Sequence, residues 1–106
     1  MPENARPYLA VLLFGSSSPA PGYRPLYRED LTLVHAASAE QARAEALDHA
    51  RRQETTHRNA AGEEITVRLL EVVDVTETLD DDLTRTADLY ARHFHDIDAY
   101  RAFDRP

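Results

Sequence analysis

Histidine and carboxylate side chains gather near the C-terminus, where His93, His95 and Asp96 follow one another closely. Imidazole and carboxylate groups suit zinc and similar ions, and two histidines two positions apart on a strand would project to the same side. A structural metal site normally takes four ligands, however, and the sequence offers no further cluster. We therefore expect polar surface residues here, with no metal ion and no cofactor.

A second group of polar residues surrounds the long loop predicted over 15–25. Arg24, Tyr27 and Arg28 could form an edge that binds an anion, and His35 could serve as a general base. The chain has neither the lysine of a phosphate-binding loop nor a cysteine nucleophile, so we predict no catalytic residue. The alternative interpretation is a small-molecule-binding domain, or a small enzyme, that uses this loop as a lid over the sheet.

Acidic side chains are concentrated in the second part of the sequence. Residues 1–62 carry seven arginines and seven acidic residues, whereas residues 63–106 carry five arginines and twelve acidic residues. The whole formal charge of −7 therefore lies in the second part, and such a field repels the phosphates of nucleic acids. We predict a protein partner, basic in character, and no nucleic acid. The predicted contact residues are Asp80, Asp81 and Asp82, which would attract the partner, and the aromatic anchors Tyr100 and Phe103.

The length of 106 residues corresponds to a single domain, 1–106, whose first six residues are predicted to be flexible. No apolar run approaches the roughly 20 residues that span a bilayer, and the N-terminus lacks the layout of a signal peptide. These features favour the cytoplasm and no membrane partner. All twelve basic residues are arginine, which is typical of a high-GC bacterial genome. The oligomeric state is left open, with a homodimer as one alternative.

The first half of the chain predicts two strands and a helix. The run Tyr8–Phe14 is apolar on both faces, which indicates a buried strand, and alternation over Tyr27–Ala36 predicts a second one. Ser38 is predicted to cap a helix that extends to Gln53, with Gln41 completing a capping box. The apolar stripe of this helix is almost all alanine, so we expect its backbone to lie close to the sheet.

The second half predicts a hairpin and a less regular end. Strands over Thr55–Asn59 and Glu63–Thr78 are joined by a turn in which Gly62 tolerates positive φ. One face is predicted to carry Ile65, Val67, Leu69, Val73 and Val75, and the other Leu70 and Val72. The second of these strands is therefore either covered on both faces in its middle or bulged there. Ala87–Phe94 fits a helix or a strand, and its pattern alone favours the helix; in the strand alternative, Asp96 caps a short helix over Ile97–Phe103.

Four runs of sequence occur in a characteristic order: LYREDLTLVHAAS, AEQARAEA, HRNAAGEEITVRLLEVVDV and ADLYARHF. This order, with Asn59 and Gly62 as its most specific positions, resembles a small bacterial family catalogued as domain of unknown function 4288, over residues 7–94. The resemblance implies a compact ββαββ core and a further strand over 87–94. The acidic link 80–82 and the tail HDIDAYRAFDRP depart from the family pattern. The resemblance implies no catalytic residues.

Together these observations predict an α+β fold. We expect an antiparallel sheet with a ββαββ core and an extra C-terminal strand, one main helix packed on one face, and a short C-terminal helix. For function we predict a non-catalytic binding or regulatory module that acts through protein–protein contacts, such as an immunity-type or dimeric accessory protein. Whether the chain is an enzyme is left open, with a preference for none.

Overall fold

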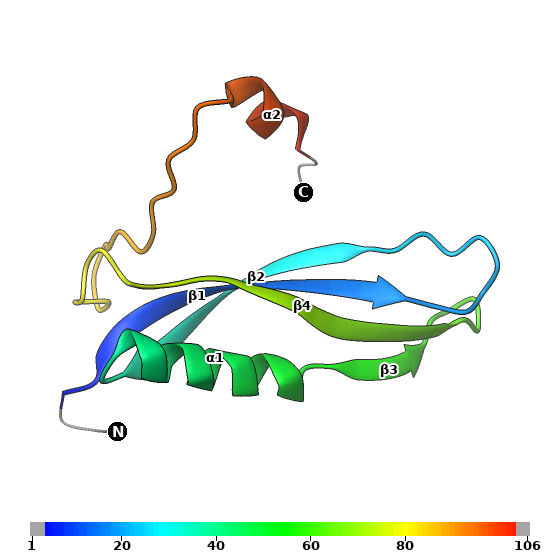
Figure 1. Ribbon diagram of the computed structural model, residues 1–106, viewed down its shortest axis with the longest axis horizontal. Coiled ribbons are helices and arrows are strands. Elements are labelled where there is room, and N and C mark those ends of the chain that lie inside the picture. Colours follow the sequence, from blue (N-terminus) through cyan, green and yellow to red (C-terminus); the bar gives the residue numbers. More distant parts are fainter. Residues whose placement is uncertain (1–3, 104–106) are drawn as a thin grey trace.

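Over residues 4–103, the computed structural model contains one four-stranded antiparallel sheet and two helices (Figure 1). The strands lie in the order β2-β1-β4-β3, and the first helix follows the first two strands. The predicted α+β class, with its antiparallel sheet and two helices, is confirmed at this level. The elements are β1 (Arg6–Ser17), β2 (Tyr27–Ala36), α1 (Ala39–Arg52), β3 (Thr55–Arg58), β4 (Glu64–Glu77) and α2 (Ile97–Ala102).

The central strand of the sheet is β1, which pairs with β2 on one side and with β4 on the other. Its apolar residues are buried on both faces, as the unbroken apolar run predicts. We call the face toward α1 the closed face and the opposite one the open face. The buried side chains of β1 are Tyr8, Ala10, Leu12 and Phe14 on the closed face and Leu9 and Val11 on the open face.

The loop between β1 and β2 is shorter than predicted. Residues 15–17 belong to β1, and the backbone N–H of Ser16 donates to the carbonyl of Leu26 at 2.9 Å. The Ser16 hydroxyl accepts the N–H of Leu26 in turn, at 2.8 Å, which extends the hairpin. The connection therefore spans 18–26, not 15–25, and it projects beyond the end of the sheet (Figure 1). Of the predicted flexible segment 1–6, residues 1–3 lie outside the described residues and Arg6 begins β1.

Helix α1 begins with the predicted cap. The hydroxyl of Ser38 accepts the N–H of Gln41 at 3.1 Å, and the Gln41 side chain accepts the N–H of Ala37 at 2.8 Å. The Ser38 bond satisfies a donor that the first helical turn leaves unpaired, whereas the Gln41 side chain bonds the residue before the cap and does not close the predicted capping box on the N–H of Ser38. The alanines of the apolar stripe then meet the closed face at short range, because alanine adds only one methyl group beyond the backbone. The alanines with no exposed surface are Ala42, Ala46 and Ala50.

Two β-bulges in β4 explain why its apolar residues occur on both parities. The register against β1 shifts twice, and each shift leaves one residue of β4 without a partner, first Leu70 and then Val73. Val72 therefore joins Val75 in packing against the closed-face core, while Val73 is partly exposed. The bulged alternative is the correct one. The prediction that Val73 shares a face with Val75 is wrong.

The turn between β3 and β4 forms around the two residues that the sequence indicates. The side-chain carbonyl of Asn59 accepts the N–H groups of Ala61 at 3.0 Å and Glu63 at 2.9 Å. Gly62 has a φ of +78°, a conformation that a residue with a Cβ rarely adopts. The strands themselves end one residue earlier and begin one residue later than predicted, at Arg58 and Glu64.

The C-terminal part holds the main correction, because residues 87–94 form neither a strand nor a helix. Only two backbone hydrogen bonds tie the start of this segment to the loop after β4, from Leu79 to Leu89 at 3.4 Å and from Asp80 to Asp88 at 3.0 Å. The segment then rises away from the sheet on the open-face side and does not run along an edge of the sheet, so its backbone meets no strand to pair with (Figure 1). We call residues 87–103 the C-terminal arm.

The arm ends in the short helix that the sequence predicts. The carboxylate of Asp96 accepts the N–H of Ala99 at 3.0 Å and caps α2. In Figure 1 the helices α1 and α2 lie on opposite sides of the sheet, and α2 stands away from it. No helix within residues 4–103 is both long and apolar enough to cross a membrane.

Candidate functional site: an apolar cleft under the C-terminal arm

The open face of the sheet presents aliphatic side chains that no element of the described chain covers completely. Leu31 and Leu33 of β2 pair with Val11 and Leu9 of β1, and the bulge residue Val73 adds a fifth aliphatic group. The two β1 residues are buried between their neighbours, but Leu31 is 61% exposed and Leu33 and Val73 are also exposed. The sheet therefore carries a row of unburied aliphatic groups beside its central strand.

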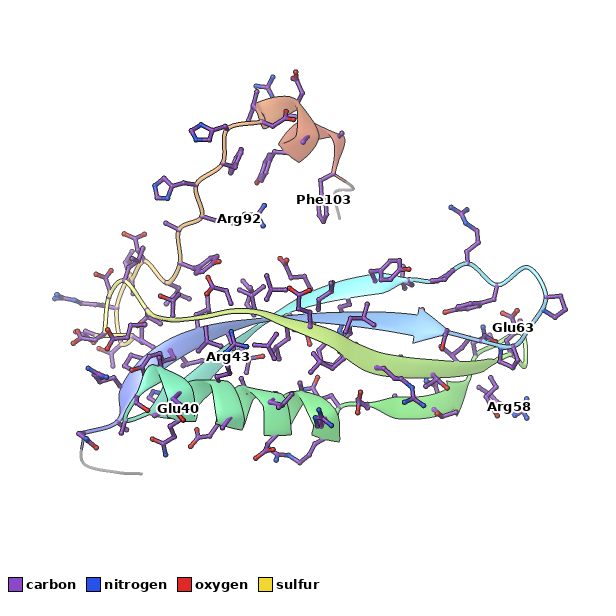
Figure 2. The ribbon with its side chains drawn as sticks, in the orientation of Figure 1. Glu40, Arg43, Arg58, Glu63, Arg92 and Phe103 are labelled. Atoms are coloured by element: carbon purple, nitrogen blue, oxygen red, sulfur yellow. The ribbon has the colours of Figure 1, made fainter. Side chains whose placement is uncertain are left out.

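The arm presents aromatic side chains above this row. The rings of Phe94 and Tyr100 stack with their centroids 4.9 Å apart and their planes 8° apart, which joins the extended segment to α2. Figure 2 shows Phe103 directed from the end of α2 toward the sheet, and this side chain is 75% exposed. All three rings retain much of their apolar surface in contact with water.

One side-chain hydrogen bond attaches the arm to the open face. The hydroxyl of Tyr90 donates to the carboxylate of Asp74 on β4 at 2.9 Å. This bond, together with partial desolvation and the negative charge of Asp74, raises the pKa of Tyr90 above its ordinary value, and the negative charge of Glu29 adds to this while the positive charge of Arg92 opposes it. Tyr90 therefore stays protonated and able to donate at neutral pH.

Between the arm and the open face lies a cleft of about 1280 Å³. Ligand pockets are usually about 300–1,000 Å³ and enclose most of their ligand. This cleft is larger, and its walls are partly exposed side chains from two separate parts of the chain. From the sheet it is lined by Val11, Glu29, Leu31 and Val73, and from the arm by Tyr90, Arg92, Phe94, His95, Asp96, Ala99, Tyr100 and Phe103.

The structure separates the predicted partner-binding residues into two places. Tyr100 and Phe103 line the cleft, whereas Asp80, Asp81 and Asp82 lie in the loop after β4 and do not. The acidic link and the aromatic anchors therefore do not form one continuous surface in this chain.

Two of the three acidic side chains of this loop maintain its shape. A carboxylate oxygen of Asp80 accepts the N–H of Asp88 at 2.7 Å. Asp82 accepts the hydroxyl of Thr84 at 2.6 Å and its N–H at 3.1 Å, and these bonds lower the pKa of Asp82 below its ordinary value of 3.8. The described residues give no such bond for Asp81, which is exposed.

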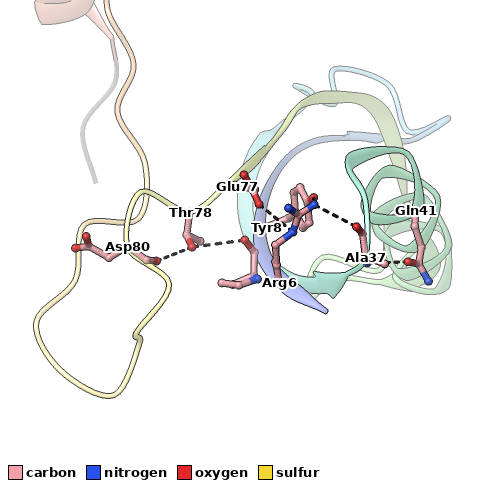
Figure 3. Close-up of polar contacts among 8 residues, drawn as sticks. Arg6, Tyr8, Ala37, Gln41, Glu77, Thr78 and Asp80 are labelled. Atoms are coloured by element: carbon pink, nitrogen blue, oxygen red, sulfur yellow. Dashed lines mark hydrogen bonds and ion pairs between the residues drawn. The ribbon is translucent and has the colours of Figure 1, made fainter. Parts of the chain in front are cut away.

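Polar contacts at the start of β1 hold the root of this loop in place (Figure 3). The hydroxyl of Thr78 donates to the backbone carbonyl of Asp80 at 2.6 Å, and its N–H donates to the carbonyl of Pro7 at 3.1 Å. Beside them, Arg6 pairs with Glu77 at 3.1 Å and donates to the Tyr8 hydroxyl at 2.8 Å. Arg6 also donates to the backbone carbonyl of Ala37 at 3.1 Å, which links the start of β1 to the residues just before α1.

The alternative ligand-binding residues do not converge on a common point. Arg28 pairs with Asp30 at 2.8 Å and places its guanidinium 4.5 Å from the ring centre of Phe14, on the closed face. Tyr27 and His35 lie near opposite ends of β2, about 26 Å apart at 3.3 Å per residue. Arg24 is exposed in the loop beyond the sheet. A ligand of ordinary size would not contact this set together.

The histidines considered as metal ligands lie on the extended part of the arm, ahead of α2. His93 and His95 are both exposed, and of the two only His95 lines the cleft, next to Asp96. The Asp96 carboxylate is already engaged in capping α2. Over residues 4–103, no group of three or more histidine, cysteine, aspartate or glutamate side chains is arranged to hold a metal ion.

Several cleft residues were missed by sequence reasoning, above all Leu31, Val73, Tyr90 and Phe94. Their signal was present in part, because the sequence predicts only one long helix for a sheet whose central strand is apolar on both faces. One face of such a sheet must find another cover or remain exposed. Which residues border the exposed region depends on the bulges and on the path of the arm.

Comparison with known proteins identifies the family but supplies no function. The family described as domain of unknown function (DUF4288) matches residues 7–91, which is most of the chain. The chain belongs to this family. No curated protein and no solved structure gives a significant match. The match ends before Phe94, so the aromatic end of the arm lies outside the part of this DUF4288 protein that the family model covers.

Proposed function

We propose that this protein is a non-catalytic binding module that acts through protein–protein contacts, and that its binding surface is the cleft between the open face and the C-terminal arm. The observation that carries the proposal is the row of exposed aliphatic groups on the open face, opposed by exposed aromatic rings. Contiguous apolar surface of this kind marks interaction sites in soluble proteins. Aromatic residues are also enriched among the side chains that dominate binding energy.

The positions of the residues considered for ligand binding favour a polypeptide over a small molecule as the occupant of the cleft. A small-molecule site needs a few polar groups that converge on the ligand, and the residues considered for that role, among them Arg28 and His35, lie far apart. The loop considered as a lid, now 18–26, contributes no residue to the cleft. These features make the small-molecule or enzymatic alternative the weaker one.

The acidic loop after β4 gives the same protein a second means of recognition. Asp81 is exposed and free of the bonds that occupy Asp80 and Asp82, so it can act on an approaching basic partner. Charges outside the apolar contact mainly raise the rate of association. We place the protein in the bacterial cytoplasm, on the grounds of its arginine-only basic residues and its lack of cysteine.

The chain has no cysteine, so one introduced thiol reports on a single position. We would label Leu33→Cys, which lies on the open face beside the cleft, two residues along β2 from the lining residue Leu31, and Leu26→Cys, in the β1–β2 loop, with a thiol reagent at nanomolar protein concentration. A lysate of the source cells would be added after separation into fractions above and below about 5 kDa. We expect the large fraction to slow labelling at position 33 by at least about fivefold and to leave position 26 unchanged.

Three other results would count against the proposal. Protection of position 33 by the small fraction alone would favour the small-molecule alternative. Equal protection of both positions would indicate non-specific binding, and no protection by either fraction would show that the cleft has no ligand in these cells.

A further inference from the structure

We infer that the occupant of the cleft is a second copy of this chain, in a symmetric dimer in which the arm of each copy lies on the open face of the other. This inference rests on the proposed function, because it names the protein that binds to the same cleft. Four features of the chain support it, namely its surface area, its dimensions, the self-complementarity of its apolar surfaces and the distribution of charge around the cleft.

The accessible surface of the chain is too large for a compact monomer. It amounts to 8145 Å², whereas a compact protein of 12.0 kDa exposes about 6,000 Å². The difference is about 2,000 Å² for each chain. Stable homodimers bury roughly 2,000–5,000 Å² in total, counted over both partners. Two copies that bury most of this excess against each other would therefore form an interface of the size that a stable dimer needs.

The dimensions of the chain show that it is extended, and the arm contributes to this. The radius of gyration is 16.8 Å, compared with about 13 Å for a compact domain of this length. Figure 1 shows α2 held away from the sheet by the extended part of the arm. The Tyr90–Asp74 bond fixes the point where the arm leaves the open face, and residues 91–96 lead outward from there. The aromatic end of the arm is thus presented to another molecule.

The two apolar surfaces of one chain complement each other. Aliphatic groups, with Leu31 and Leu33 foremost, lie on the sheet, and aromatic rings, with Tyr100 and Phe103 foremost, lie on the arm. A two-fold axis brings the arm of each copy onto the sheet of the other. The aliphatic groups of both sheets and the aromatic rings of both arms are then buried in the same interface. No third molecule is then required to bury them.

Charge around the cleft does not oppose such a contact. Its lining carries Glu29 and Asp96 against Arg92, with His95 beside them, so it is nearly balanced even though the chain as a whole carries −7. Within residues 4–103, neither Glu29 nor Arg92 takes part in an ion pair. In a symmetric dimer, Arg92 of each copy can pair with Glu29 of the other. The acidic loop, with Asp81, stays outside the contact.

The first test is the molar mass of the full chain by sedimentation equilibrium. We expect about 24 kDa, twice the 12.0 kDa of one chain, at micromolar concentration. Leu31→Arg places a charge in the middle of the contact and should raise the dissociation constant at least about 100-fold. Leu26→Arg is the matched control, because Leu26 is 74% exposed and lies outside the cleft, and it should leave the dimer intact.

The second test establishes the arrangement by disulfide formation between two single-cysteine variants. Leu33→Cys and Tyr100→Cys are mixed in equal amounts and oxidised, so that any disulfide joining positions 33 and 100 must lie between chains. We expect this product to form at least about tenfold faster than the product of Leu26→Cys with Tyr100→Cys. In the double variant L33C/Y100C, a disulfide found only within one chain would show that the arm closes on its own sheet, which overturns the inference.

The outcomes separate the dimer from the proposed function. A chain that is monomeric at all concentrations, with position 33 still protected by the large lysate fraction, would overturn the dimer and leave the binding module in place. A monomeric chain without such protection would overturn both. A dimer whose mass does not respond to Leu31→Arg would use another surface and would also overturn this inference.

Discussion

The two faces of the sheet differ in how completely the chain covers them, although both are built on the same central strand. On the closed face, α1 sets three fully buried alanines against β1, and Leu12 and Phe14 have no exposed surface. On the open face, Leu9 and Val11 are nearly as buried, but their neighbour Leu31 remains exposed. A strand that is apolar on both sides needs two covers, and this chain packs only one of them tightly against the sheet.

The two faces differ in whether the burial of apolar side chains already stabilises the folded chain. Complete burial of an aliphatic or aromatic side chain contributes about 1.5–3 kcal/mol. On the closed face this contribution already stabilises the folded chain. On the open face and the arm, much of this contribution would be gained only if another surface covered the exposed side chains, which is why we propose the interaction there.

The largest effect expected is the contrast between one substitution made on the two faces. Leu12→Ala leaves a cavity in the closed face and should lower the free energy of unfolding by about 2–5 kcal/mol. Leu31→Ala, at a concentration low enough to keep the chain monomeric, should change it by no more than about 0.5 kcal/mol. Urea unfolding followed by circular dichroism measures both. Similar losses at the two positions would mean that the open face is covered within a single chain.

A second comparison concerns the closeness of α1 to the closed face. Ala46→Leu adds three carbon atoms where no space is exposed and should cost about 1–3 kcal/mol. Ala44→Leu makes the same change on the exposed side of the helix and should stay within about 0.5 kcal/mol. Unchanged stability of the Ala46 variant in urea would contradict close packing of the helix on the sheet.

A third, smaller effect is expected where the arm is tied to the open face. Tyr90→Phe removes the hydrogen bond to Asp74 and should cost about 0.5–1.5 kcal/mol. Because folding raises the pKa of Tyr90, its contribution is fully present below pH 10, the ordinary value for tyrosine, and is lost as the pH rises through the raised pKa.

The pH dependence provides the control for this third prediction. The difference in unfolding free energy between the wild type and Tyr90→Phe should shrink above pH 10, since the wild type then loses the same bond. A difference that stays constant from pH 7 to pH 11 would show that the bond is not made in solution.

The smallest effect is expected in the loop that carries the arm, where the contacts are exposed to water. The carboxyl of Asp82 should titrate below 3.8, and Thr84→Ala should move its pKa back toward that value, because the hydroxyl bond to Asp82 is lost. Since folding lowers this pKa, the associated stabilisation is present at neutral pH and is lost as the pH falls through it. Carbon-13 NMR of the side-chain carboxyl carbon of Asp82 measures both values.

Features that depend on neighbouring residues were determined by the sequence itself. The apolar run of β1, the Ser38 cap of α1 and the turn with Asn59 and Gly62 each appear in the structure where the sequence predicts them. Each of these is decided within a few residues, by the period of the side chains or by hydrogen bonds between a side chain and the adjacent backbone. The short α2, with Asp96 as its cap, follows for the same reason.

Only the tertiary structure decided which residues form the cleft. Val73 turns toward the open face because two bulges shift the register of β4 against β1, a property of two strands about sixty residues apart. The segment 87–94 has a pattern that a strand could use, yet it rises away from the sheet and pairs with no strand of the described chain (Figure 1). Leu31 remains exposed because, within residues 4–103, no second long helix covers that side. The sequence pattern indicates which side chains favour burial. Whether a face of the sheet is covered depends on which segment, distant in the sequence, packs against it.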